Sequence, residues 1–313
     1  MITVASLFSG IGGIDLGFQQ AGCEIVWANE FDKDAAITYR QNFSNTPLIE
    51  GDIRKVKAES IPDFDILVAG FPCQPFSIVG KQRGFDDPRG NLFFEIARIL
   101  DKKRPAVVFL ENVQNLIEHD KGKTFLVIYN ALVQFGYYVN YKVLDSQFYG
   151  NIPQQRKRIY IVGFLDCSMS DNFRFPDEIP LTMQLNDVID RSVCHDKIYY
   201  YNASSFWYED LVRTVIDSKA LYKINDYGVS AKKHFVCPTL MANMGTYPDR
   251  IPVLKDDFGI RKLTPRECLA LQGFPSEFTF NGISLNNAYK QCGNSVTVPV
   301  IRRIADAILK VLR

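Results

Sequence analysis

The sequence predicts an α/β fold, with a mostly parallel, doubly wound sheet and a smaller, irregular second domain. The first observation is that apolar strand-like runs alternate with helix-like segments over the first 165 residues, a pattern typical of strands joined by crossover helices. The second is a glycine-rich loop after the first predicted strand. The third is a change past Phe164, where the periodicity weakens up to about residue 258 and Tyr, Asn, Asp, Ser and Pro become frequent.

The predicted elements follow one another in a regular order. Short apolar runs have the length of buried strands, and they lie at 2–8, 23–28, 48–50, 65–69, 107–110, 138–144 and 159–162. The segments between them predict helices, which lie just before Gln20 and at 31–43, 91–103 and 115–136. Beyond the irregular region, Thr264 as N-cap and Pro265 at the first helical position predict another helix. The segment 298–312 predicts a final amphipathic helix.

Composition limits the class of protein. The chain has 313 residues, which suits one large domain with a small one. Its 36 basic residues nearly balance 35 acidic ones, so a nucleic-acid partner has to be argued from local clusters and not from net charge. The seven Cys include no Cys-x-x-Cys pair, which disfavours a disulfide framework or a structural zinc site. With no basic leader and no apolar run near ~18 residues, we expect a soluble cytoplasmic protein.

Two predicted strands end in residues that can do chemistry. The strand at 65–69 runs into Gly70-Phe71-Pro72-Cys73-Gln74, where Gly and Pro force a loop. The strand at 107–110 ends in Glu111. Open α/β sheets place their active sites at the carboxyl ends of strands. A thiol and a carboxylate at two such ends predict a nucleophile with an acid partner.

The glycine loop indicates a ligand that approaches the backbone closely. It reads Phe8-Ser9-Gly10-Ile11-Gly12-Gly13, and it stands between the first strand and the first helix. Glycines there permit a tight turn and close contact with a ligand. The loop lacks the Gly-x-Gly-x-x-Gly spacing of dinucleotide sites. A purely structural turn is the alternative.

Acidic residues at two further strand ends narrow the class of ligand that the loop is expected to bind. Glu30 closes the second predicted strand, where a carboxylate can bind ribose hydroxyls. Asp52 closes the third and can accept from an adenine amino group, while Phe31 is placed to stack on the base. The alternative is that both carboxylates are helix caps. Together with the loop, these residues predict a nucleoside-containing cofactor.

The motifs of the chain stand in a recognisable order. They are the loop 8–13, Pro72-Cys73-Gln74, Glu111-Asn112-Val113, Gln154-Gln155-Arg156-Lys157-Arg158, the block 261–275, and Gly293-Asn294-Ser295-Val296. In these motifs the chain resembles, nearly end to end, the cytosine-5 DNA methyltransferases of bacterial type II restriction–modification systems. The match is weakest at about 166–235, the variable region of that family.

The resemblance implies a fold and a division into domains. The family has a Rossmann-like, S-adenosylmethionine-dependent methyltransferase sheet with one antiparallel strand, plus a smaller, irregular target-recognition domain. Its C-terminal helix returns to the N-terminal domain. We therefore expect a catalytic domain at 1–187 with 288–313, a target-recognition domain at 188–287, and DNA held between them.

The resemblance also implies catalytic roles. Cys73 would be the thiolate that adds to carbon 6 of cytosine, so that carbon 5 accepts a methyl group. Glu111 would hydrogen-bond or protonate ring nitrogen 3. Arg156 and Arg158, expected to share one face of a strand, would hold the cytosine carbonyl, Glu111 or a phosphate; a solvated basic strand start is the alternative.

The cofactor implied is S-adenosyl-L-methionine, without a metal. The residues expected to bind it are Phe8, Gly10, Gly12, Gly13, Glu30, Phe31, Asp52, Ile53, Pro72, Asn294 and Ser295.

The substrate implied is double-stranded DNA, from which the target base is flipped out. The segment 74–91, with Lys81, Arg83 and Arg89, is expected to be a mobile loop that closes over the flipped base, with its basic residues on phosphates. Lys232, Lys233, Thr239 and Leu240 are expected groove contacts in the small domain. Surface positions without a role in binding are the alternative for each set.

Three other functions fit the sequence less well. A transfer-RNA methyltransferase of the same family would carry a Cys-Phe-Thr signature, which the recognition region lacks. A silent scaffold homologue would not need Cys73, Glu111 and the glycine loop, and an unrelated nucleotide-binding enzyme would make the motif set accidental. We expect a monomer, with any cognate restriction endonuclease on a separate chain.

Overall fold

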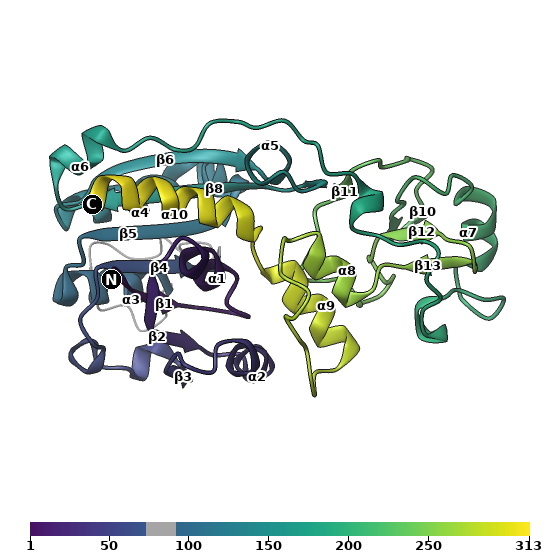
Figure 1. The fold of residues 1–313 in the computed structure, drawn as a ribbon, viewed down its shortest axis with the longest axis horizontal. Helices are drawn as coiled ribbons and strands as arrows, with labels where there is room; N and C mark the ends of the chain where they lie inside the picture. The colour runs from purple at the N-terminus through teal and green to yellow at the C-terminus, as the bar shows by residue number, and fades with distance from the viewer. Residues whose placement is uncertain (73–91) are drawn as a thin grey trace. The chain divides into compact units, whose positions relative to one another are not determined.

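The computed structural model describes residues 1–72 and 92–313, which form two compact units (Figure 1). Unit 1 comprises Met1–Leu144, Lys157–Asp177 and Val300–Arg313. Unit 2 comprises Asp145–Arg156 and Glu178–Pro299. The chain leaves unit 1 and returns to it twice, so neither unit is one continuous stretch.

Unit 1 is built on a sheet that has seven strands within the described residues. Their order is β3-β2-β1-β4-β5-β8-β6. The bounds are β1 (Thr3–Leu7), β2 (Glu24–Glu30), β3 (Leu48–Glu50), β4 (Ile66–Gly70), β5 (Val107–Val113), β6 (Tyr138–Asp145) and β8 (Lys157–Phe164). Strands β3, β2, β1, β4 and β5 pair in parallel, and β8 runs antiparallel to β5. The predicted α/β sheet and the antiparallel strand are therefore confirmed.

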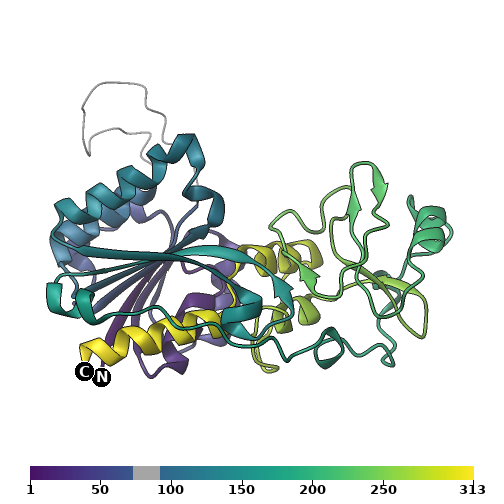
Figure 2. The same ribbon diagram turned by 90° about the horizontal axis from the view of Figure 1, so that it is seen from above.

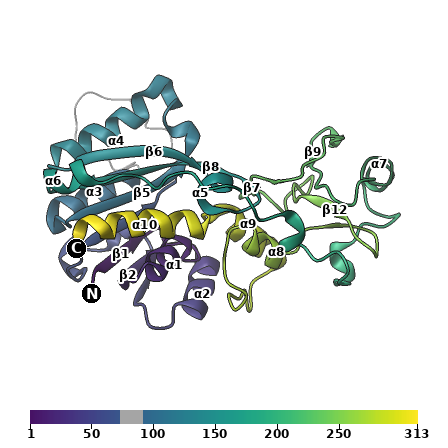
Figure 3. The ribbon, with the colours of Figure 1, turned by 45° about the horizontal axis from the view of Figure 1, so that its top comes forward.

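Helices cover both faces of this sheet (Figures 2 and 3). On one face lie α3 (Leu92–Lys103) and α4 (Lys123–Gln134), and on the other lie α1 (Gly13–Gln20) and α10 (Val298–Leu312). The contact between α1 and α10 is close, because a Cβ on Gly17 would come within 2.6 Å of Ile301. Unit 1 also contains α2 (Lys33–Asn42) and α6 (Cys167–Asn172). The predicted final helix is confirmed, and it returns to the N-terminal part of the chain.

The helix predicted at 115–136 is wrong in its first third. Two short 3₁₀ turns, Gln114–Leu116 and His119–Gly122, precede α4. Asp120, Lys121 and Gly122 have φ angles of 49°, 56° and 83°. Residues with these left-handed angles cannot continue a right-handed helix, so the helix begins at Lys123.

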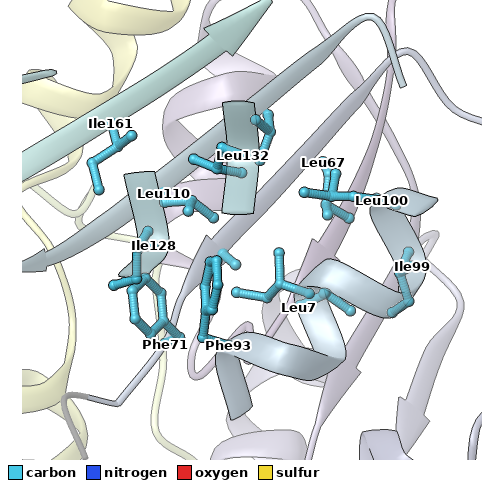
Figure 4. Close-up of a cluster of buried hydrophobic side chains, with 14 of the residues drawn as sticks. Leu7, Leu67, Phe71, Phe93, Ile99, Leu100, Leu110, Ile128, Leu132 and Ile161 are labelled. Carbon is cyan, nitrogen blue, oxygen red and sulfur yellow. The ribbon is translucent and has the colours of Figure 1, made fainter. Parts of the chain in front are cut away.

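The core between the sheet and the α3–α4 layer follows the alternation of the strands. Leu7, Leu67 and Leu110 point to this layer from β1, β4 and β5, and they pack with Phe93 of α3 and Ile128 of α4 (Figure 4). These side chains are buried. Successive strand residues face opposite sides, and on the other face Phe109 meets Phe18 of α1 with ring centroids 5.3 Å apart. The central strands are thus buried on both faces, which fixes their register.

Unit 2 has short elements joined by long irregular segments, as its sequence predicts. They are α5 (Ser146–Gly150), β7 (Gln154–Gln155), α7 (Tyr208–Thr214), β9 (Ile224–Asn225), β10 (Gly228–Val229), β11 (Cys237–Pro238), β12 (Val253–Lys255), β13 (Ile260–Lys262), α8 (Pro265–Ala270) and α9 (Leu285–Asn294). Helix α8 begins as predicted, since Thr264 accepts a hydrogen bond from the backbone N–H of Glu267. Across 1–72 and 92–313, no helix combines the length and apolar character needed to cross a bilayer.

Candidate active site

The carboxyl ends of the parallel strands meet at one edge of the sheet. In the register, Leu7 pairs with Ala69, Gly70 pairs with Glu111, and Glu30 pairs with Glu50. Glu30 and Glu111 occupy these positions, and the glycine loop begins directly after Leu7. Parallel pairing therefore gathers them from distant parts of the sequence.

The glycine loop has a backbone that side chains rarely permit. Phe8, Gly10 and Gly12 have φ angles of 54°, 56° and 86°. A Cβ on Gly12 would lie 2.2 Å from the ring of Phe43, so only glycine fits there. A Cβ on Gly10 would have no atom within 4 Å. The backbone at Gly10 is thus open on the side where a ligand can approach.

Glu30 holds this loop in place. Its Oε2 accepts a hydrogen bond from Gly10 N at 2.7 Å, and its Oε1 accepts one from Asp32 N at 2.7 Å. Burial raises the pKa of the Glu30 carboxyl, although these hydrogen bonds act in the opposite direction. Each oxygen of a carboxylate can accept a second hydrogen bond. The residue can therefore support the loop and still accept from a ligand hydroxyl.

The end of β2 also presents an aromatic ring, and the end of β3 presents a carboxylate. Phe31 leaves 70% of its surface exposed, which is unusual for a phenylalanine. Asp52 accepts from the backbone and guanidinium of Arg54, with the shortest contact at 2.6 Å. These hydrogen bonds from Arg54 hold the pKa of Asp52 below its ordinary value. The side chain of Ile53 is buried in the core, and Pro72 is exposed.

The acid motif, Glu111-Asn112-Val113 at the end of β5, forms another part of the candidate site. Glu111 Oε1 lies 3.2 Å from Nε of Arg158 on β8, and both side chains are mostly buried. A Cβ on Gly70 would lie 3.6 Å from Glu111 Oε2, so the carboxylate reaches the end of β4. Asn112 donates from Nδ2 to the carbonyl of Phe71 at 2.8 Å. This bond fixes the backbone two residues before Cys73, and no sequence pattern indicates this role of Asn112.

Several predicted residues lie outside the described part of the chain. They are Cys73, Lys81, Arg83 and Arg89, together with the rest of the segment 74–91.

Arg156 does not share a strand face with Arg158, and this expectation is wrong. Arg156 stands between β7 and β8 and belongs to unit 2. Its guanidinium donates to the carbonyl oxygens of Leu240 at 2.8 Å and Gly293 at 3.1 Å, and also to that of Ser295. Strand alternation cannot apply across the break between two strands. Arg156 instead ties together two distant segments of unit 2.

The remaining predicted residues also lie in unit 2. Asn294 ends α9, and Ser295 is its buried C-cap. Leu240 is completely buried, which argues against a DNA contact by its side chain, and Thr239 donates from Oγ1 to Gln155 O at 2.6 Å. Lys232 and Lys233 are exposed, and Lys233 pairs with Asp217 at 3.0 Å.

Comparisons with known proteins agree with this arrangement. A family model described as C-5 cytosine-specific DNA methylase matches residues 2–310. The type II methyltransferase M.Bsp6I of Bacillus sp. (strain RFL6) is 50% identical over 313 residues, covering 99% of each chain. M.SsoII of Shigella sonnei is 41% identical over 98% of this chain and 79% of its own. Among solved structures, Spodoptera frugiperda DNMT2 (a mutant) has a TM-score of 0.78 at 20% identity, covering 99% of this chain and all of its own. S. pombe Dnmt2 has 0.77 at 21%, covering both chains fully. At such identities these two structures establish the fold alone.

Proposed function

The chain belongs to the C-5 cytosine-specific DNA methylase family, and from this premise we propose how its residues carry out the reaction. It is a DNA (cytosine-5-)-methyltransferase of the type II restriction–modification class. The observation that carries the proposed mechanism is the pairing of Gly70 with Glu111. It brings the acid motif beside the strand that leads to Cys73.

The residues at the edge of unit 1 fit S-adenosyl-L-methionine. The open backbone at Gly10 can approach its polar groups, and Glu30 offers acceptors for ribose hydroxyls. Phe31 offers an exposed ring face for the adenine, and Asp52 offers an acceptor for its amino group. We assign Phe8, Gly12, Gly13, Ile53 and Pro72 to the same site, and we propose that Asn294 and Ser295 also bind the cofactor. When bound, S-adenosylmethionine supplies an electrophilic methyl group.

Cys73 makes the base reactive in this proposal. Its thiolate adds to carbon 6 of the flipped cytosine, and the electron pair displaced from the 5,6 double bond makes carbon 5 nucleophilic. After methyl transfer, loss of the carbon-5 proton and departure of the thiolate restore the ring. A low-pKa thiol is suited to both steps, because it attacks and leaves readily.

Glu111 relieves the charge that develops on the ring as the thiolate adds. A carboxyl group held against nitrogen 3 can donate a hydrogen bond or a proton there. Arg158 keeps the Glu111 carboxyl in one orientation, as the 3.2 Å contact supports. For Arg156 we propose a positioning role within unit 2, since its donors already serve three carbonyl oxygens.

DNA is the substrate, and we propose that unit 2 contributes to its recognition. Lys232 and Lys233 are exposed and can contact phosphates. We propose that Thr239, whose hydroxyl donates a hydrogen bond to the backbone carbonyl of Gln155, contacts DNA. For Leu240 we propose that it shapes the segment that Arg156 holds. In the segment beyond Pro72, Lys81, Arg83 and Arg89 are proposed phosphate contacts.

The organisation of the protein in the cell is also a proposal. We retain the catalytic domain at 1–187 with 288–313 and the target-recognition domain at 188–287. We infer a monomer that acts in the cytoplasm, with a separate chain as cognate restriction endonuclease.

Bisulfite sequencing tests the function directly. DNA and RNA from a methylation-free bacterial host expressing the protein are compared with those from a host expressing Cys73→Ala. Protected cytosines in one short recurring DNA sequence, absent with the variant, are expected. Protection of RNA alone, or equal protection with Cys73→Ala, would refute the proposal.

A further inference from the structure

A buried carboxylate lies directly beneath the glycine loop. Asp15 is completely buried in α1, between the buried residues Ile14 and Phe18. Its Oδ1 accepts a hydrogen bond from Ser6 Oγ at 2.6 Å, and its Oδ2 accepts one from Tyr39 OH at 2.6 Å. Both partners are buried as well. Burial of a carboxyl group without an opposite charge is costly, so stability alone would favour an apolar residue at this position.

These bonds join the two ends of the loop 8–13. Ser6 lies at the end of β1, two residues before the loop, and Asp15 lies two residues after it. Ser9, inside the loop, donates from Oγ to Ser6 Oγ at 3.0 Å. The hydrogen-bonded chain thus runs from the loop through β1 to α1.

Tyr39 extends this support to the underside of the loop. Its ring stacks on Phe43 with centroids 4.5 Å apart. Phe43 occupies the space that a Cβ on Gly12 would need. A displacement of Tyr39 would therefore move the ring against which Gly12 packs.

We propose that Asp15 is a positioning residue for S-adenosylmethionine, which holds the glycine loop in its binding shape through Ser6 and Tyr39. This inference rests on the cofactor assignment proposed above. Asp15 does not touch the ligand; it acts on the backbone of the loop. Glu30 supports the loop in a second way, because it accepts a hydrogen bond from Gly10 N directly.

The protonation state of Asp15 decides whether it can accept both hydrogen bonds. Burial raises its pKa to about 6. The groups that face it are the hydroxyls of Ser6 from β1 and Tyr39 from α2. Of the other elements packed on α1, β4 carries no charged residue and β2 carries Glu24 and Glu30. On α10, Arg302 and Asp306 lie within 4.0 Å of each other.

Asp15→Asn tests the proposal, because a carboxamide oxygen can replace only one carboxylate acceptor. Binding of S-adenosylhomocysteine to the full-length protein is measured by calorimetry from about pH 5 to about pH 8. The variant should bind roughly tenfold more weakly at about pH 7.5, as expected for the loss of one or two hydrogen bonds. The difference should shrink below about pH 6, where the wild-type Asp15 is itself neutral. The turnover number at saturating cofactor should remain near the wild-type value.

Two further variants make the result decisive. Asp101→Asn makes the same charge change at an exposed position of α3 and should bind like the wild type. Tyr39→Phe removes one bond while keeping the ring, and it should weaken binding even if Asp15→Asn fails to fold. Wild-type affinity in Asp15→Asn and Tyr39→Phe at every pH would overturn this inference alone. Failure of the wild-type protein to bind S-adenosylhomocysteine would overturn the cofactor assignment and this inference with it.

Discussion

Glu111 is the residue whose surroundings say most about the chemistry. It stands where β4 and β8 flank β5, so its carboxylate meets the end of one neighbour and the arginine of the other. A mostly buried arginine–carboxylate pair has few alternative geometries. The group is thus held in one direction before the base arrives.

Replacement of Glu111 tests the acid role. Glu111→Gln keeps the size of the side chain but cannot supply a proton, so the methylation rate should fall by at least about 100-fold. Single-turnover methyl transfer to DNA measures this, and S-adenosylhomocysteine affinity should stay unchanged. Glu118→Gln, at an exposed position beyond β5, is the control. A near-normal rate in Glu111→Gln would remove the acid role.

Asp15 should also shape the pH dependence of stability. Its pKa is raised by burial from 3.8 to about 6, so the folded state favours the protonated form. Its contribution to stability is complete below about pH 4 and is lost as the pH rises through about 6, a difference of about 3 kcal/mol. Urea unfolding at about pH 4, 5.5 and 7 should show this loss in the wild type and not in Asp15→Asn. Parallel pH profiles would contradict the assignment.

Among single residues, the sequence predicted those whose chemical type and position at a strand end both indicate a function. Glu111 and Glu30 follow apolar strands, and the structure brings both to the edge of the sheet. Asp15 was not predicted, because an acidic residue in a helix is normally exposed. Its role depends on Tyr39, which is 24 residues away, and no local pattern reveals that contact.

Among the elements, α9 is held by an unusually close approach of two backbones. A Cβ on Gly293 would lie 2.1 Å from the carbonyl carbon and oxygen of Met241. The same two segments receive hydrogen bonds from Arg156, through Leu240 and Gly293. Gly293 and Arg156 therefore both stabilise the junction between the segment at Leu240–Met241 and the end of α9.

Gly293→Ala should disrupt this junction. The added methyl group overlaps main-chain atoms, which cannot rotate away, so we expect a loss of about 3 kcal/mol in the free energy of unfolding. Urea unfolding measures this change. Lys290→Ala, one turn earlier on the exposed side of α9, should leave stability almost unchanged. Equal midpoints for the two variants would show that the segment at Met241 moves freely.

The sequence predicted elements well where periodicity was strong and poorly where a few residues interrupt it. The helix at 298–312 and the start of α8 agree with the structure. The start of α4 was missed because left-handed residues such as Asp120 have no sequence marker comparable to proline. The break between β7 and β8 was missed because the motif reads as one polar run.

Considered as a whole, the molecule depends on segments that are distant in sequence. Unit 1 takes its last part, Val300–Arg313, from beyond unit 2. The proposed functional boundary differs from the packing boundary: residues 145–156, 178–187 and 288–299 pack in unit 2, although the resemblance gives them to the catalytic domain. Packing groups residues by contact, whereas a catalytic domain is defined by what binds to it.

A chain that ends at Pro299 tests how far unit 1 depends on α10. The truncation removes the buried residues Val300, Ile301, Ile304, Ile308 and Leu309. Their burial is worth about 10 kcal/mol, comparable to the whole stability of a domain. The shortened protein should lose both its cooperative thermal transition and S-adenosylhomocysteine binding. Lys310→Ala, exposed on α10, should keep both. Wild-type binding by the shortened chain would contradict the prediction.

The late position of α10 has a consequence for newly made protein. The ribosome completes β1 to β8 before residues 178–299, and α10 follows them. At about 5–20 residues per second, the sheet, whose last strand ends at Phe164, waits from about 7 to about 30 seconds for α10, which ends at Leu312 and covers one face together with α1. During that time the nascent chain offers an apolar surface to chaperones. We therefore expect a new chain to methylate DNA only after residues 298–312 have been made.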